Sequence, residues 1–166
     1  MVNVEDAILG AGLTLLGFSF AVVWDIIRER RERSSERRRL LEFLQRETDD
    51  NAERAQRAIQ PLQSATGFIV TLPPLSTEGW SVAISFWSLL QLNSEVASLL
   101  ATSYQLARGF NVVNSSREQF QITQNALSTY AQVLSGLNTA AEQKCTEFVR
   151  QHKDLKAALE RILTDP

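Results

Sequence analysis

The 166-residue sequence has few of the residues from which catalytic and metal sites are built. It contains one cysteine, Cys145, and one histidine, His152. A single cysteine cannot form an intramolecular disulfide, which agrees with a reducing compartment. One cysteine and one histidine seven residues apart also do not make a metal-ligand set, and no catalytic arrangement of serine, histidine and acid can be inferred. We therefore expect no enzyme activity, no cofactor and no metal.

Basic residues are too few overall for a typical nucleic-acid binder. The formal net charge is −2 and the pI is near 5.5, whereas such proteins are normally basic or carry an undiluted basic face. A phosphate-binding glycine loop is missing too, because Gly10, Gly12 and Gly17 fall inside an apolar run. Nucleic acid is therefore not the partner that we expect.

Ionisable residues are absent from Ala7 to Trp24, and Asp6 and Asp25 bound this run. A bilayer core of about 30 Å needs about 20 apolar residues in a helix, a length that the run reaches if it extends to Ile27. Only a helix can cross lipid as a single segment, because each backbone donor and acceptor must find its partner within it. The pattern predicts a transmembrane anchor over residues 1–27.

A cleaved signal peptide and a buried core helix are the alternatives for this run. A signal peptide has basic residues before the apolar run and small residues at a cleavage site after it. Here Glu5 and Asp6 precede the run, and no such site follows Val23. A core helix would show a polar face, but only Thr14 and Ser19 are polar. An uncleaved anchor fits the pattern better than either alternative.

Arginines gather directly after the run, where the helix is expected to continue as a stalk over residues 28–60. By the positive-inside rule they keep the rest of the chain in the cytoplasm and the acidic N-terminus outside the plasma (inner) membrane. Interleaved glutamates, with Glu29 four residues before Arg33, favour a solvated stalk that meets anionic headgroups. A grip on nucleic acid is the alternative role. The membrane-proximal basic residues are Arg28, Arg30, Arg31, Arg33, Arg37, Arg38 and Arg39.

Four small residues share one face of the predicted anchor, at steps of four, three and four. Such a stripe lets helix backbones approach closely in lipid, which favours self-association of the anchors in a dimer or a ring. The alternative is chance, because glycine and alanine are common in membrane helices. The candidate packing or pore face consists of Gly10, Thr14, Gly17 and Ala21.

The stalk carries a heptad-like seam with a weak centre. A buried asparagine at one core position can set the register and oligomeric state of a coiled coil, so Asn51 is a candidate for that role. The alternative is an ordinary amphipathic helix that packs on its own domain. The seam comprises Leu41, Leu44, Thr48, Asn51, Ala55, Ala58 and Leu62.

Residues 61–166 are expected to form a cytoplasmic helical domain. Pro61 and the pair Pro73-Pro74 bracket an irregular segment whose apolar FIVTL sequence is expected to form an extended loop packed on the domain. Ser76 or Thr77 then caps a helix. This helix carries aromatic residues that either wedge into the core or present an apolar surface to a partner, namely Trp80, Phe86 and Trp87.

Longer helices are expected to follow. Asn93 is typical of an N-cap, and the helix that it opens is predicted to end at Asn-Ser-Ser 114–116. Residues 117–163 are helical in pattern again. Gly136, together with a capping-box pattern from Thr139 to Glu142, leaves open whether they form one helix or two.

The order of these segments resembles a widespread set of small bacterial and archaeal membrane-anchored helical proteins. After an apolar anchor and an arginine-rich stalk come LLEFLQRETDDNAERA, LPPLSTEGWSVA and YQLARGFN. In those proteins an acidic residue and an asparagine on the first cytoplasmic helix, a proline-led tryptophan helix and a tyrosine-to-asparagine helix end recur. The matching residues here are Glu47, Asn51, Pro73, Trp80, Tyr104 and Asn111.

The layout also looks like the small membrane accessory proteins of RNA-targeting CRISPR loci. That resemblance implies oligomerisation into membrane pores that strengthen antiviral defence. A ribonuclease motif invoked for that group, Arg followed by four to six residues and His, is absent. The three positions before His152 where the arginine would fall hold Cys145, Thr146 and Glu147.

We thus expect an all-α, single-pass protein whose N-terminal transmembrane helix continues into a stalk and a cytoplasmic helical bundle. One hypothesis is a homo-oligomeric, ring-forming membrane effector, based on the small-residue face and the seam. A second is a membrane-tethered adaptor that recruits a cytoplasmic partner through an apolar surface. A third, capture of nucleic acid by the arginines, predicts steep salt dependence.

Overall fold

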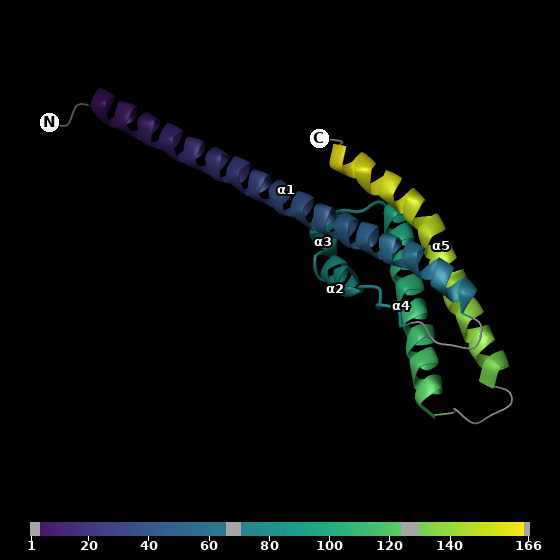
Figure 1. Cartoon of the computed structure of the whole chain (residues 1–166). Coiled ribbons are helices and arrows are strands. Elements are labelled where there is room, and N and C mark those ends of the chain that lie inside the picture. Colours follow the sequence, from purple (N-terminus) through teal and green to yellow (C-terminus); the bar gives the residue numbers. More distant parts are fainter. Residues whose placement is uncertain (1–3, 66–70, 124–129, 165–166) are drawn as a thin grey trace. The chain divides into compact units, whose positions relative to one another are not determined.

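The computed structural model describes residues 4–65, 71–123 and 130–164, with side chains over 17–65, 71–120 and 130–164. Its five helices are α1 (Val4–Ser64), α2 (Glu78–Ser85), α3 (Trp87–Leu90), α4 (Ser94–Thr123) and α5 (Tyr130–Thr164) (Figure 1). These described segments contain no strand, so the predicted all-α class is confirmed. The FIVTL prediction falls largely on residues 66–70 and lies outside the described residues.

The chain divides into two compact units, Met1–Arg39 and Leu40–Pro166. The division comes after the last arginine of the basic stretch, whereas the sequence suggested boundaries at residues 27 and 60. Residues 40–60 therefore belong with the helical bundle, because their apolar side chains are part of its core.

In the first unit α1 is an exposed helix. From Phe18 to Gln60 it contains no proline and no glycine. The expected i,i+4 pairs form: the Arg28 Nε–Glu32 Oε1 distance is 2.9 Å, and the Arg33 Nη2–Glu29 Oε1 distance is 2.6 Å. Exposed pairs of this kind contribute only about 0.3–0.5 kcal/mol each.

Over the residues that the structure describes, no helix is both long enough and apolar enough to span a bilayer. The side chains of residues 7–16, ten of the 21 residues from Ala7 to Ile27, lie outside that description. Gly10 and Thr14 of the candidate packing face are among them.

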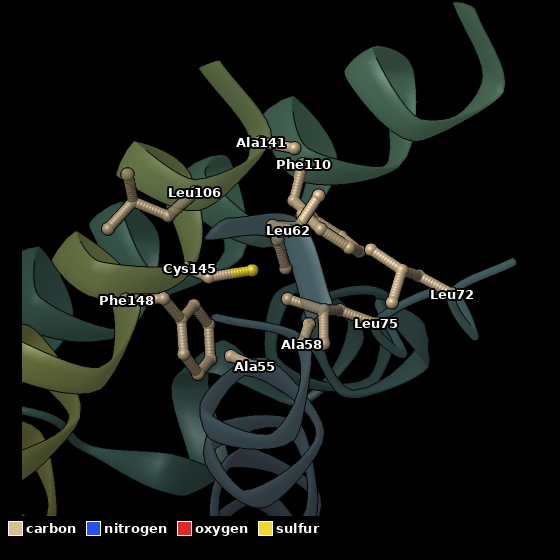
Figure 2. Packing of buried hydrophobic residues seen from close by; sticks show 11 residues of the cluster. Ala55, Ala58, Leu62, Leu72, Leu75, Leu106, Phe110, Ala141, Cys145 and Phe148 are labelled. Carbon is tan, nitrogen blue, oxygen red and sulfur yellow. The ribbon is translucent and has the colours of Figure 1, made fainter. Parts of the chain in front are cut away.

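In the second unit the C-terminal part of α1 packs with α4 and α5 around two apolar clusters. One cluster joins α1 at Ala55 and Leu62 to Phe110 of α4 and to Cys145 and Phe148 of α5. Figure 2 shows the Cys145 sulfur lying among these side chains. Each helix supplies residues spaced three and four apart, and this spacing places them on one helical face.

The other cluster brings α2 and α3 onto the bundle. Ala83 of α2 and Leu90 of α3 are fully buried against Leu44 of α1, Leu100 of α4 and Leu155 of α5. The two short helices are therefore held from one side only, by their contact with the bundle.

The seam predicted on α1 lies inside this core. Each of its seven side chains is at most 4 % exposed within a single chain. The structure therefore favours the interpretation in which this helix packs on its own domain, and these side chains are not available for a contact with another subunit. The residues concerned are Leu41, Leu44, Thr48, Asn51, Ala55, Ala58 and Leu62.

Several helix ends differ from those expected. Helix α1 continues through Pro61 to Ser64: a proline this close to the end removes only one late hydrogen bond, and Leu62 and Ala65 are buried. Helix α4 does not end at 114–116 but reaches Thr123. Helix α5 passes Gly136 without a break, and the hydroxyl of Thr139 donates to the Ser135 carbonyl instead of capping a new helix.

Candidate functional site

The site is built around an extended segment, residues 72–79, that runs from Leu72 into the first turn of α2. The side chain of Asn51 of α1 holds the middle of this segment with two hydrogen bonds to the backbone of Ser76. Asn51 Nδ2 donates to the Ser76 carbonyl (2.8 Å), and the Ser76 N–H donates to Asn51 Oδ1 (2.7 Å). Asn51 is 1 % exposed. Its amide thus replaces the partner that a neighbouring strand would give this backbone.

Asparagines of α4 hold the preceding residues in the same way. The Leu75 N–H donates to Asn111 Oδ1, and Asn111 Nδ2 donates to the Leu75 carbonyl, both at 2.8 Å. Asn114 Nδ2 donates to the Leu72 carbonyl at 3.0 Å. Pro73 and Pro74 have no N–H to satisfy, and the Pro74 carbonyl accepts a hydrogen bond from Arg54 Nη1 at 3.2 Å.

Glu47 of α1 caps α2 from a neighbouring helix. Its Oε2 accepts a hydrogen bond from the Gly79 N–H at 2.7 Å, a donor in the first turn of α2 that has no partner inside the helix. Thr77 occupies the N-cap position, but its side chain makes no cap bond. A carboxylate at a helix N-terminus is also favoured by the helix dipole. Of the two predicted caps, Ser76 makes only a long contact, in which its Oγ accepts the Glu78 N–H at 3.5 Å, and Glu47 supplies the shorter, tertiary cap.

Tyr104 of α4 lies beside this cap. Its ring centroid is 5.7 Å from that of Trp80, and a Cβ added at Gly79 would collide with its hydroxyl. Burial, followed by the negative charge of Glu47, raises the pKa of Tyr104 well above its ordinary value. Within the described residues, Glu47 Oε1, Ser103 Oγ and the Tyr104 hydroxyl have no hydrogen-bond partner.

A buried arginine connects α4 to α5. Arg117 of α4 is 0 % exposed; its Nε donates to Asn138 Oδ1 and its Nη1 to Asn114 Oδ1, both at 2.8 Å. Asn138 of α5 in turn donates to the Ala65 carbonyl. Burial lowers the pKa of Arg117 from its ordinary value, and it raises the pKa of the nearby Cys145 thiol to about 12. The hydrogen bonds of Arg117 and Asn138 link α4 and α5 to the residue that follows α1. A thiol with so high a pKa keeps its proton at neutral pH and is not a nucleophile.

One half-buried ionic group connects α1 to α5. Asp49 Oδ1 lies 2.7 Å from His152 Nε2 and 3.2 Å from Lys156 Nζ. The side chain of His152 is only 12 % exposed. The histidine therefore has a structural partner.

The described residues of the bundle line a small hollow and a wider depression. A small one of about 120 Å³ lies between α2 and α4 and is lined by Trp80, Ala101, Tyr104, Gln105 and Arg108. A wider depression of about 640 Å³ follows α5 from Thr139 to Arg150. All the residues that line the wider depression come from one helix, so side chains of other elements do not converge on it.

The predicted aromatics are divided between the core and the surface. Trp80 packs against the cluster of α2, α3 and α4, as a wedge into the core would. Phe86 and Trp87 are 41 % and 43 % exposed, and Ile84 beside them is 56 % exposed. These three residues, the α2–α3 apolar surface, match the alternative of an apolar surface open to a partner.

In the first unit, Gly17 and Ala21 are exposed, as are the seven predicted arginines except Arg37, which is half-buried. The structure brings no other group of the described residues onto Gly17, since a Cβ there would meet nothing within 4 Å.

The residues quoted for the family resemblance converge in space. Glu47 and Asn51 bind the 72–79 segment, Asn111 binds Leu75, and the ring of Trp80 is tilted against that of Tyr104. The sequence patterns did not indicate that Asn114, Arg117 or Gly79 belongs to this site. The signal available for them was weak: an asparagine where a helix was expected to end, and an arginine three residues later in a helix.

The described residues contain no group of three or more histidine, cysteine, aspartate or glutamate side chains that could hold a metal ion. Comparison of the chain with protein-family models, with curated proteins and with solved structures gives no match.

Proposed function

We propose that this protein is a membrane-tethered adaptor. Residues 7–27 of α1 insert into the plasma (inner) membrane as one span with the N-terminus outside. Residues 40–166 form a helical bundle that offers an apolar surface to a cytoplasmic partner.

The observation that carries the proposal is a set of seven large apolar side chains within ten residues of α1. At 100° per residue they spread over about 240° of the helix circumference, far more than the apolar stripe of about 100° on an amphipathic surface helix, and a helix this widely apolar belongs in a core or in lipid. Their exposed fractions run from 41 % to 71 %. The residues are Phe18, Phe20, Val22, Val23, Trp24, Ile26 and Ile27.

Charge supports the proposed orientation. Seven arginines lie between Arg28 and Arg39, directly after the apolar set, where the positive-inside rule places the cytoplasmic side. Each arginine near an anionic leaflet adds about 1 kcal/mol of surface attraction. Trp24 precedes them by four residues, in the zone where an indole prefers the lipid interface.

The bundle supports an adaptor more than a ring. The α1 seam that favoured a ring is buried within one chain, so its burial lends no support to a contact between subunits. By contrast, Ile84, Phe86 and Trp87 are exposed on two short helices. Clustered exposed apolar side chains are typical of interaction sites.

A homo-oligomeric pore-forming effector in antiviral defence is the second candidate. It is favoured by Gly17 and Ala21, which are small and exposed on one helical face and leave room for a second backbone. The resemblance to the accessory proteins of RNA-targeting CRISPR loci agrees with this alternative.

The anchor is tested by carbonate extraction of membranes that contain the full-length chain. We expect the wild type to stay in the membrane pellet and the double variant Phe20→Arg/Val23→Arg to be released. The matched control, Val112→Arg, places a charge at an exposed valine of α4 and should stay in the pellet. A wild-type chain that is extracted by carbonate contradicts the proposal.

The two functions are separated by the size of the detergent-extracted particle and by dye release from vesicles. An adaptor predicts no closed ring and no dye release, with Gly17→Leu behaving as the wild type. A ring that releases dye, and that Gly17→Leu disrupts, would establish the pore and reject the adaptor.

A further inference from the structure

The small hollow between α2 and α4 has the chemistry of a binding site that is independent of the anchor. Its walls are the rings of Trp80 and Tyr104, whose centroids are 5.7 Å apart, and its edge carries Gln105 and Arg108. The segment before Trp80 is fixed by the hydrogen bonds of Glu47 and Asn51, and Tyr104 is fixed by its burial in the core. The aromatic walls are therefore pre-formed, and the edge is polar.

Arg108 stands apart from other basic residues in the sequence. It is the only basic residue between Arg57 and Arg117 in the sequence. In the part of the chain that the structure describes, its guanidinium forms no hydrogen bond and no ion pair, and the amide of Gln105 is also unbonded. Both side chains are exposed. Two donor groups without an acceptor thus stand at the mouth of an apolar hollow.

These donors define the charge of the ligand. A guanidinium has only donors, and its planar fork matches a carboxylate with two parallel hydrogen bonds. The amide of Gln105 can add a third donor. A cationic ligand would face Arg108 as a like charge, and a neutral one would leave the guanidinium unused.

The volume defines the size of the ligand. About 120 Å³ corresponds to about four water molecules at about 30 Å³ each. It is well below the 300–1,000 Å³ of sites for drug-sized molecules. A carboxylate with one or two methylene groups fits this space, with the methylenes against the indole of Trp80.

We propose that this hollow binds a carboxylate on a short aliphatic stem, with Arg108 and Gln105 holding the carboxylate and Trp80 and Tyr104 holding the stem. The carboxylate belongs either to a small free acid or to a glutamate or aspartate side chain of a peptide. The chemistry is the same for both sources.

The probe is propionate, titrated into the full-length chain in detergent micelles at constant ionic strength, with chloride as the balancing anion. The sequence contains three tryptophans, so the double variant Trp24→Phe/Trp87→Phe leaves Trp80 as the only indole reporter. We expect a saturable change in Trp80 fluorescence. Propionamide, which has the same shape and no charge, should need at least tenfold higher concentration.

Variants of Arg108 test the assignment. Arg108→Gln should weaken propionate binding at least tenfold, and Arg108→Lys, which keeps the charge and loses the fork, should fall between it and the wild type. The matched control is Arg161→Gln on α5, an exposed arginine away from the hollow, which should change binding less than twofold. Thermal unfolding followed by circular dichroism checks that each variant is folded.

A second titration, with acetyl-Gly-Glu-Gly-amide, distinguishes a free acid from an acidic side chain of a peptide. Tighter binding of the tripeptide than of propionate assigns the hollow to a protein partner, and the reverse assigns it to a free acid. Equal responses to propionate and propionamide, a response that does not saturate, or unchanged binding in Arg108→Gln would overturn the proposal.

Discussion

The Glu47 carboxylate on α1 accepts the Gly79 N–H at 2.7 Å and so begins α2 from another helix. Gly79 makes this approach possible because a Cβ at that position would lie 2.5 Å from Glu47 Oε2 and 3.0 Å from Leu44 Cδ2. The contact ties the start of α2, the helix that carries Ile84 of the α2–α3 apolar surface, to the buried part of α1. It couples the presentation of that surface to the stability of the bundle.

Gly79→Ala should therefore destabilise the bundle. The added methyl group has to push aside the Tyr104 hydroxyl and the Glu47 carboxylate, both of which are buried, and overpacking of this kind costs about 1–3 kcal/mol. Urea unfolding followed by circular dichroism measures the change in the free energy of unfolding.

Gly136→Ala is the matched control for this substitution. Gly136 also lies inside a helix, but nothing lies within 4 Å of its Cβ position. Alanine there should stabilise α5 by about 0.5–1 kcal/mol, since glycine is the weaker helix former. Equal effects of the two substitutions would show that Gly79 is not closely packed.

Asn51→Ala should cost about 2–4 kcal/mol, because it leaves the N–H and the carbonyl of Ser76 without their partners. Asn51→Asp keeps the acceptor and loses the donor, so it should be intermediate. Gln56→Ala, at an exposed position of the same helix, should change the free energy of unfolding by no more than about 0.5 kcal/mol. If Asn51→Ala lowers the free energy of unfolding no more than Gln56→Ala does, the Asn51 amide does not stabilise the bundle through Ser76.

Features governed by local sequence could be predicted well. The Asn93 cap is confirmed, since its Oδ1 accepts the Val96 N–H at 2.8 Å, and so is the pair of Arg33 with Glu29. The buried stripe of α1 was visible from its spacing alone. What the spacing could not decide was whether the stripe faces its own domain or another copy, because both arrangements bury the same residues.

Features governed by tertiary contacts could not be predicted in this way. Asn114 was expected to end a helix, as asparagine often does, but its amide is occupied by the Leu72 carbonyl and Arg117, so α4 continues. Thr77 has the side chain of an N-cap, yet Glu47 reaches α2 from 32 residues away in the sequence. Sequence spacing carries no information about contacts at that range.

Arg117→Lys should destabilise the bundle by about 1.5–3 kcal/mol, because the guanidinium donates to Asn114 and Asn138 at once and a lysine cannot reproduce that fork. Arg161→Lys, at an exposed position of α5, provides the control and should be neutral within about 0.5 kcal/mol. Denaturant midpoints of the two variants give the comparison. A neutral Arg117→Lys would mean that charge alone, and not the geometry of the fork, is needed at this place.

The Cys145 thiol gives the bundle a dependence on alkaline pH. Burial raises its pKa from an ordinary value near 9 to about 12, so between these values the folded chain retains a proton that the unfolded chain releases. Stability falls with rising pH wherever the folded state binds more protons. The contribution of Cys145 is therefore fully present below about pH 9 and is lost progressively towards about pH 12. Cys145→Ala lacks this group, and its free energy of unfolding should decline less steeply over that window than that of the wild type. Equal slopes in urea titrations from pH 8 to pH 11 would show that the thiol ionises as easily in the folded chain as in the unfolded one.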